Sequence, residues 1–167
     1  HTQAHHAALP YVEVPAFIKK LRKSSSGTMI KLALELLVLT ALRTGELRNG
    51  RWDEVDFQKR VWTIPATRMK TGKEHRVPLT PRTVAILREA HAISGDGDLM
   101  FPGLKPGRPY SDMSLLMVVR RLGYEVTNHG FRSSFRDWAS ERTNFPRAVA
   151  EAALAHAIEN KTEAAYH

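Results

Sequence analysis

The segment from Thr28 to Leu42 constrains the fold more than any other part of this 167-residue chain. Its residues are apolar on almost every side, and Glu35 is the single acidic residue among them. A helix of this kind must be buried on most of its faces. We therefore predict a central core helix over residues 28–42. The apolar run is well short of the roughly 20 residues that a membrane span needs.

The composition favours one globular domain with a polyanionic partner. Hydrophobic residues make up 43% of the chain, which is enough for a packed core. The formal net charge of +8 favours nucleic acid or, less often, an anionic membrane surface. The chain has no cysteine, so disulfides and thiolate metal sites are excluded. This agrees with a reducing compartment, and we expect a cytoplasmic protein.

The remaining pattern predicts an α+β fold that is mostly α-helical with a small three-stranded antiparallel sheet. Short β-like runs at residues 52–57, 61–64 and 75–79 predict the strands. Helical periodicity and caps predict further helices over residues 15–23, 81–93, 112–122, 129–142 and 146–154, and from residue 162. After the core helix, Gly45 offers a sharp turn, and Thr44 can cap a short helix with Glu46 in its first turn.

The predicted hairpin between residues 59 and 76 is strongly basic. It holds six cations against the single acid Glu74. Such a hairpin repels itself unless it is solvated or lies against phosphate, and charge alone leaves both interpretations open. The cations are Lys59, Arg60, Arg68, Lys70, Lys73 and Arg76, and all of them except Lys70 are candidates for DNA contact.

His129 and Arg132 form a basic pair one helical turn apart. Residues at i and i+3 share a helix face, so an imidazole lies beside a guanidinium fork. The fork matches phosphate oxygens two at a time, and histidine can donate or accept a proton beside it. Phe131, Phe135 and Trp138 recur at helical spacing and are expected to bury the opposite side. The stretch indicates a phosphate-handling site.

Five motifs together resemble the tyrosine recombinase (phage integrase) family, in its catalytic domain. The sequence around Trp52 and Phe135 is similar to the prophage and genomic-island integrase branch. The resemblance covers residues 10–167, and its motifs, in family order, are Ala41-Leu42-Arg43-Thr44-Gly45-Glu46-Leu47, Met69-Lys70-Thr71-Gly72, His129-Gly130-Phe131-Arg132, Leu154-Ala155-His156 and Ala164-Ala165-Tyr166.

The resemblance implies a site-specific recombinase that cuts and rejoins DNA through a 3′-phosphotyrosyl intermediate. Tyr166 would be the nucleophile. Arg43 and Arg132 would clamp the non-bridging oxygens of the scissile phosphate, and Lys70 would protonate the departing 5′ oxygen. In this chemistry no ATP, metal or other cofactor is required, because the phosphotyrosyl bond keeps the energy of the broken linkage.

Three further residues take supporting roles in the same resemblance. His129 would assist proton transfer, and His156 would hydrogen-bond a phosphate oxygen. Glu46 matches the acidic position that buttresses the site without reacting. Tyr110 and Tyr124 are rival nucleophiles, but both adjoin Pro or Gly in loops upstream of His156.

The resemblance also sets expectations for domains and partners. Residues 1–9, with three histidines, are expected to be a lead-in or linker remnant, with metal binding by the histidines as the alternative. Residues 10–167 are the expected catalytic domain, without the family's N-terminal DNA-binding domains and C-terminal tail. The partner is double-stranded DNA, bound by a tetramer when full length, with this chain alone a monomer and no membrane involved. We expect Tyr166 to be mobile or misplaced in this domain alone.

Two alternatives to a recombinase remain. A type IB topoisomerase would use the same chemistry to relax DNA, and a DNA-binding regulator would have lost catalysis. The branch-like details favour an integrase, and the intact set of six catalytic positions argues against the regulator. A hydrolytic nuclease is disfavoured because no acidic metal cluster is apparent in the sequence.

Overall fold

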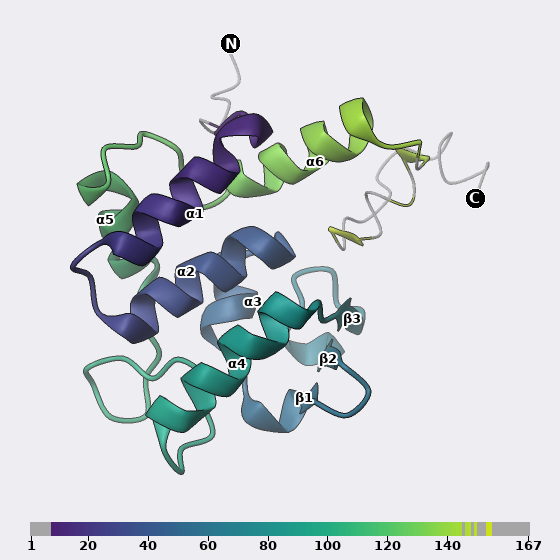
Figure 1. Cartoon of the computed structure of the whole chain (residues 1–167). Helices are drawn as coiled ribbons and strands as arrows, with labels where there is room; N and C mark the ends of the chain where they lie inside the picture. Colours follow the sequence, from purple (N-terminus) through teal and green to yellow (C-terminus); the bar gives the residue numbers. More distant parts are fainter. Residues whose placement is uncertain (1–7, 145, 148, 150–152, 155–167) are drawn as a thin grey trace.

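The computed structural model describes residues 8–144, 146, 147, 149, 153 and 154. Its elements confirm the α+β prediction: six α-helices and a small sheet lie in the described part of the chain (Figure 1). The helices are α1 (Val14–Lys23), α2 (Thr28–Thr40), α3 (Thr44–Arg48), α4 (Pro81–Ser94), α5 (Asp112–Arg121) and α6 (Gly130–Arg142). The strands are β1 (Val55–Asp56), β2 (Val61–Ile64) and β3 (His75–Pro78), with 3₁₀ turns η1 (Tyr11–Glu13), η2 (Trp52–Glu54) and η3 (Ala66–Arg68).

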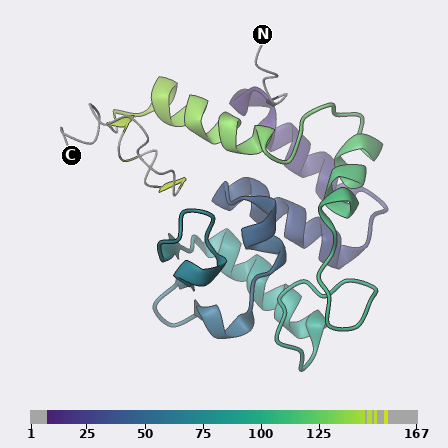
Figure 2. The same cartoon turned by 180° about the vertical axis from the view of Figure 1, so that it is seen from behind.

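Helix α2 is the central core helix that the sequence predicts. It lies between α1 and α4 and contacts both (Figure 1). Leu34 and Leu36 are fully buried, while Leu39, at 43% exposed, is the one large apolar residue of this helix that is exposed. Both views place the sheet toward the C-terminal end of α2 and α5 toward the opposite end (Figures 1 and 2).

The end of α2 differs from the prediction. The helix stops at Thr40, where Ala41 takes a left-handed conformation with φ 53° and donates its N–H to the Leu37 carbonyl. A non-glycine residue accepts that conformation at a cost of roughly 1–2 kcal/mol. The turn therefore does not use Gly45, and Arg43 rather than Thr44 is the residue that precedes α3. Because the chain turns directly after the buried run, Arg43 is placed at the junction of two helices.

The sheet has the order β1-β2-β3 and is antiparallel, as predicted. Trp62 pairs with Val77, and Ile64 pairs with His75. The predicted first strand over 52–57 was too long, because Trp52–Glu54 forms the 3₁₀ turn η2. In that turn the Glu54 carboxylate accepts the backbone N–H of Arg51 at 3.0 Å, which closes the turn locally.

Some apolar side chains of the later helices are exposed, and the prediction that Trp138 is buried was wrong. Met113 and Met117 are 61% and 45% exposed, because α5 turns Leu115, Val118 and Val119 to the core instead. Trp138 is 42% exposed and rests against Phe135 with ring centroids 6.0 Å apart. The C-terminal half of α6 extends past α2, so its apolar stripe has less of the described chain to pack against (Figure 1).

The first described residues of the chain are hydrogen-bonded to α6. The Ser134 hydroxyl donates to the carbonyl of Leu9, which is buried in the core. Tyr11 donates its hydroxyl proton to Glu141 at 2.9 Å, and Arg142 Nε donates to the Tyr11 oxygen at 2.9 Å. In the described residues no helix combines the length and apolarity that a membrane crossing requires. The predicted last helix, from residue 162, lies outside the described residues.

Candidate active site

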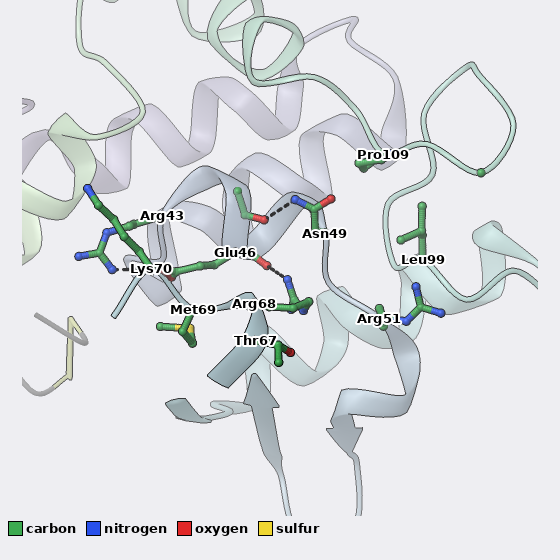
Figure 3. A pocket seen from close by; sticks show the side chains of 12 residues that line it. Arg43, Glu46, Asn49, Arg51, Thr67, Arg68, Met69, Lys70, Leu99 and Pro109 are labelled. Carbon is green, nitrogen blue, oxygen red and sulfur yellow. Dashed lines mark hydrogen bonds and ion pairs between the residues drawn. The ribbon is translucent and has the colours of Figure 1, made fainter. Parts of the chain in front are cut away.

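Arg43 and Glu46 form an ion pair at the start of α3. Arg43 Nη1 donates to Glu46 Oε1 at 3.0 Å, and the two side chains are 20% and 4% exposed (Figure 3). A buried carboxylate requires such a partner, because burial strongly disfavours an unpaired charge. The second oxygen, Oε2, is buried and accepts no hydrogen bond from the described residues. Glu46 thus holds Arg43 from the protein interior and leaves part of the guanidinium accessible to solvent.

Arg132 reaches the turn just before Arg43, although 89 positions separate the two arginines in the sequence. Its side chain is 2% exposed, and its Nη1 donates to the carbonyl of Ala41, in the turn that ends α2. Its Nη2 donates to the Leu154 carbonyl at 2.6 Å. The guanidinium therefore joins three parts of the chain: the end of α2, the start of α6 and the segment that leads to His156.

His129 occupies the position just before α6, so the helix begins one residue later than predicted. Its carbonyl accepts the backbone N–H of Arg132 at 3.0 Å, which puts the two residues in the same turn. The Thr127 hydroxyl accepts the Gly130 N–H at 2.9 Å and so satisfies a donor of the helix start. The His129 side chain is exposed, in contrast to the buried Arg132.

Lys70 follows η3 and is exposed on the wall of a pocket of about 730 Å³ that Arg43 and Glu46 also line (Figure 3). The preceding residue, Met69, is buried and anchors this end of the hairpin in the core. The hairpin thus brings the predicted general acid to the same pocket as Arg43, one of the two arginines of the predicted phosphate clamp.

The other cations of the hairpin divide into two kinds. Lys59, Arg60, Lys73 and Arg76 are exposed. Arg68 instead directs its guanidinium toward protein acceptors and is 16% exposed. Four candidates for DNA contact therefore lie on the surface, while the fifth takes part in an internal network.

His75 is a site residue that the sequence analysis missed. Burial lowers its pKa, and the positive charges of Arg132 and Arg43 lower it further, against the opposing effect of Glu46. All four side chains therefore belong to one electrostatic neighbourhood. The signal available in the sequence was the two-residue alternation of His75, Val77 and Leu79, which places the imidazole on the inward face of β3.

The last two predicted catalytic residues, His156 and Tyr166, lie outside the described residues. The nearest described position is Leu154, which is buried and held by Arg132. Of the rival tyrosines, Tyr124 packs edge-on against Phe17 at 5.0 Å between ring centroids, with the Lys20 ammonium 5.2 Å from its ring centroid. In the residues that the structure describes, no three His, Asp or Glu side chains gather as metal ligands would.

Comparison of the sequence with known proteins finds integrases among its relatives. The model of the phage integrase family matches residues 8–167. The integrase of Enterobacteria phage P4 is 35% identical over 97% of this chain, and the prophage integrase IntZ of Escherichia coli (strain K12) is 37% identical over 91%. These alignments span 41% and 38% of the two relatives, so the chain corresponds to about two fifths of their length.

Solved structures show the same fold. A crystal structure of XerA recombinase matches with a TM-score of 0.73 at 20% identity, covering 100% of this chain and 60% of that one. A lambda integrase tetramer bound to a Holliday junction matches with a TM-score of 0.70 at 20% identity, covering 96% of this chain and 50% of that one.

Proposed function

The chain belongs to the phage integrase family, in the branch of the prophage integrases, and on this premise we propose that it carries the catalytic site of a site-specific DNA recombinase. The observation that carries the proposal is the meeting of Arg132 with the turn that precedes Arg43. Arg132 is thereby tied to the turn two residues before Arg43, and Arg43 shares a pocket with Lys70. Such a cluster suits one phosphodiester, whose single negative charge is shared by two non-bridging oxygens.

The proposed step transfers a DNA phosphoryl group to a tyrosine. The phenolic oxygen of Tyr166 forms a bond to phosphorus while the bond from phosphorus to the 5′ oxygen breaks. Arg43 and Arg132 stabilise the charge that develops on the non-bridging oxygens, and each such interaction contributes about 10²–10³ in kcat. Lys70 gives a proton to the 5′ oxygen as it leaves.

The remaining residues complete the proton balance. His129 takes part in removing the phenol proton, and His156 hydrogen-bonds a phosphate oxygen. A second DNA strand with a free 5′ hydroxyl reverses the step, restores the phosphodiester and releases Tyr166. The reaction as proposed needs neither metal nor ATP, because the enzyme's own cations act on the phosphate and the phosphotyrosyl linkage retains the bond energy.

The proposed substrate is double-stranded DNA in the cytoplasm. In the proposal, the full-length protein binds this DNA as a tetramer. The exposed cations Lys59, Arg60, Lys73 and Arg76 support this substrate, because they lie in β3 or in the segments before and after β2, the second of which carries Lys70. The tetrameric lambda integrase on its junction supports the assembly. Phosphate contacts make such binding fall steeply with salt.

A nicked suicide substrate tests the proposal, because the short strand diffuses away after cleavage and leaves the enzyme attached. We expect a covalent DNA adduct that survives denaturation and disappears in Tyr166→Phe. Tyr124→Phe is the matched control and should keep the adduct. An adduct that persists undiminished in Tyr166→Phe would contradict the assignment of the nucleophile.

The same assay separates the alternatives. A topoisomerase would relax supercoiled plasmid that lacks any specific recombination site, whereas the recombinase should leave such a plasmid unchanged. A DNA-binding regulator would bind the site and form no adduct.

A further inference from the structure

Arg68 and Glu54 form a close bidentate ion pair directly before Lys70. Arg68 Nε and Nη2 donate to the two carboxylate oxygens of Glu54, each at 2.6 Å. The side chains are 16% and 6% exposed, so the pair is largely withdrawn from solvent. Fork-to-fork geometry of this kind fixes both the distance and the plane of the two groups.

Glu54 is itself held rigidly. Besides Arg68, its Oε1 accepts the Arg51 backbone N–H at 3.0 Å and the indole N–H of Trp62 at 3.2 Å. Trp62 is fully buried in the central strand β2. The carboxylate that receives Arg68 is therefore part of the sheet's framework.

The third donor of Arg68 reaches the other half of the site. Its Nη1 donates to the backbone carbonyl of Glu46 at 3.1 Å (Figure 3). Glu46 is the partner of Arg43, so the guanidinium of Arg68 connects the sheet and the hairpin to α3, the short helix that Arg43 precedes. Arg68 ends η3, two residues before Lys70, and only the buried Met69 lies between them.

The position of Lys70 depends on this connection. Lys70 is exposed, and the chain that follows it runs through a turn at Gly72 with φ 70° before β3 begins. The firm attachment of this segment is thus on the N-terminal side, at Arg68 and Met69. A general acid must stay within hydrogen-bond reach of the oxygen that it protonates.

We propose that Arg68, held by Glu54, is a positioning residue that sets the distance between Lys70 and the phosphate bound at Arg43. This rests on the proposed function, in which Lys70 protonates the 5′ oxygen. Arg68 was a candidate for DNA contact from its charge alone. Its three protein acceptors assign it a role behind the reacting groups.

The test compares the rates at which the full-length protein cleaves two substrates. One has the ordinary 5′ oxygen at the scissile position, and the other has a 5′ bridging sulfur. A thiol has a pKa near 8.5, so the thiolate leaves without a proton, whereas an alkoxide requires one. The ratio of the two rates on one enzyme preparation does not depend on the folded fraction, which removes the effect of partial unfolding.

We expect Arg68→Gln to slow cleavage of the oxygen substrate by roughly 10- to 100-fold, as a displacement of about 1 Å does in other enzymes. Cleavage of the sulfur substrate should change by less than about threefold. Glu54→Gln should give the same signature more weakly, and Arg68→Lys should fall between Arg68→Gln and wild type because it keeps charge without the fork. Arg76→Gln is the control, with a loss that is equal on both substrates.

Three results are informative. Selective loss on the oxygen substrate in both Arg68→Gln and Lys70→Ala supports the proposal. If sulfur rescues Lys70→Ala but leaves Arg68→Gln slow, the positioning role is wrong while the acid role of Lys70 stands. If sulfur rescues neither variant, Lys70 is not the acid and both proposals about this hairpin are overturned.

Discussion

Glu35 connects three helices through one buried carboxylate, and its replacement tests how the core helix is held. The group is 2% exposed and accepts hydrogen bonds from Arg22 of α1 at 2.7 and 2.9 Å. It also accepts from Arg82 of α4 at 2.6 and 3.2 Å. Burial opposes ionisation, but the hydrogen bonds from Arg22 and Arg82 outweigh it, so the pKa of Glu35 lies below its ordinary value.

The expected cost of Glu35→Gln follows from the exposure of its partners. Removing one member of a buried pair costs roughly 3–5 kcal/mol when the other is stranded without solvent. The side chains of Arg22 and Arg82 are 52% and 41% exposed, so water can solvate them after the change. We therefore expect a loss of about 2 kcal/mol in the free energy of unfolding. In a chain of this size that lowers Tm by about 4–8 °C.

Urea denaturation followed by circular dichroism measures this loss at neutral and acidic pH. Because the folded pKa of Glu35 is lowered, its contribution is complete above the ordinary pKa of about 4.3 and disappears as pH falls through the folded pKa. The gap between wild type and Glu35→Gln should therefore narrow in acid. Asp96→Asn, at an exposed loop position, is the control and should cost less than about 0.5 kcal/mol. A loss that small in Glu35→Gln, or a gap that stays constant with pH, would refute the reasoning.

Three further predictions concern the site itself. Glu46→Gln weakens the support of Arg43 and should slow formation of the covalent adduct about tenfold in single-turnover cleavage. The affinity for DNA, measured by filter binding, should change less than twofold. Equal losses in the cleavage rate and in the affinity would instead indicate a DNA contact. The pKa of His75 should lie below the ordinary histidine value of about 6.5 in an NMR titration. Protonation of His75 therefore has no effect on stability above that pH and destabilises the fold as the pH falls below it. A raised pKa would show that the charge of Glu46 outweighs burial. Ala41→Gly removes the cost of a left-handed alanine and should raise stability by about 0.5–1 kcal/mol in thermal unfolding, whereas a loss would mean that the alanine side chain is needed there.

The sequence predicted those features that depend on local pattern. The all-round apolar character of residues 28–42 was enough to identify a buried helix, and the alternation in β2 and β3 was enough for the sheet. The motifs that contain Arg43, Lys70, His129 and Arg132 were identified by their resemblance to those of the tyrosine recombinase family, in the family's order. The structure brings Arg132 to the turn before Arg43 and places Lys70 with Arg43 on one pocket.

Features that depend on distant partners could not be predicted. The sharp turn at Ala41 has no local signal in the sequence, since Gly45 is the better candidate by propensity. In the structure, Arg132 holds the carbonyl of Ala41 in this turn. The inward orientation of Arg68 depends on Glu54, 14 positions earlier. Trp138 has helical spacing with Phe131 but is 42% exposed among the described residues, which periodicity does not reveal.

The central claim is that a tyrosine near the end of this chain attacks a DNA phosphate held between Arg43 and Arg132. Mass spectrometry of peptides from the trapped adduct tests it most directly, because the nucleotide mass marks the residue that is attached. The account predicts a phosphotyrosyl linkage on Tyr166, and its loss in Arg43→Ala and Arg132→Ala. A linkage on Tyr110 or Tyr124, or an adduct that forms equally well without either arginine, would contradict it.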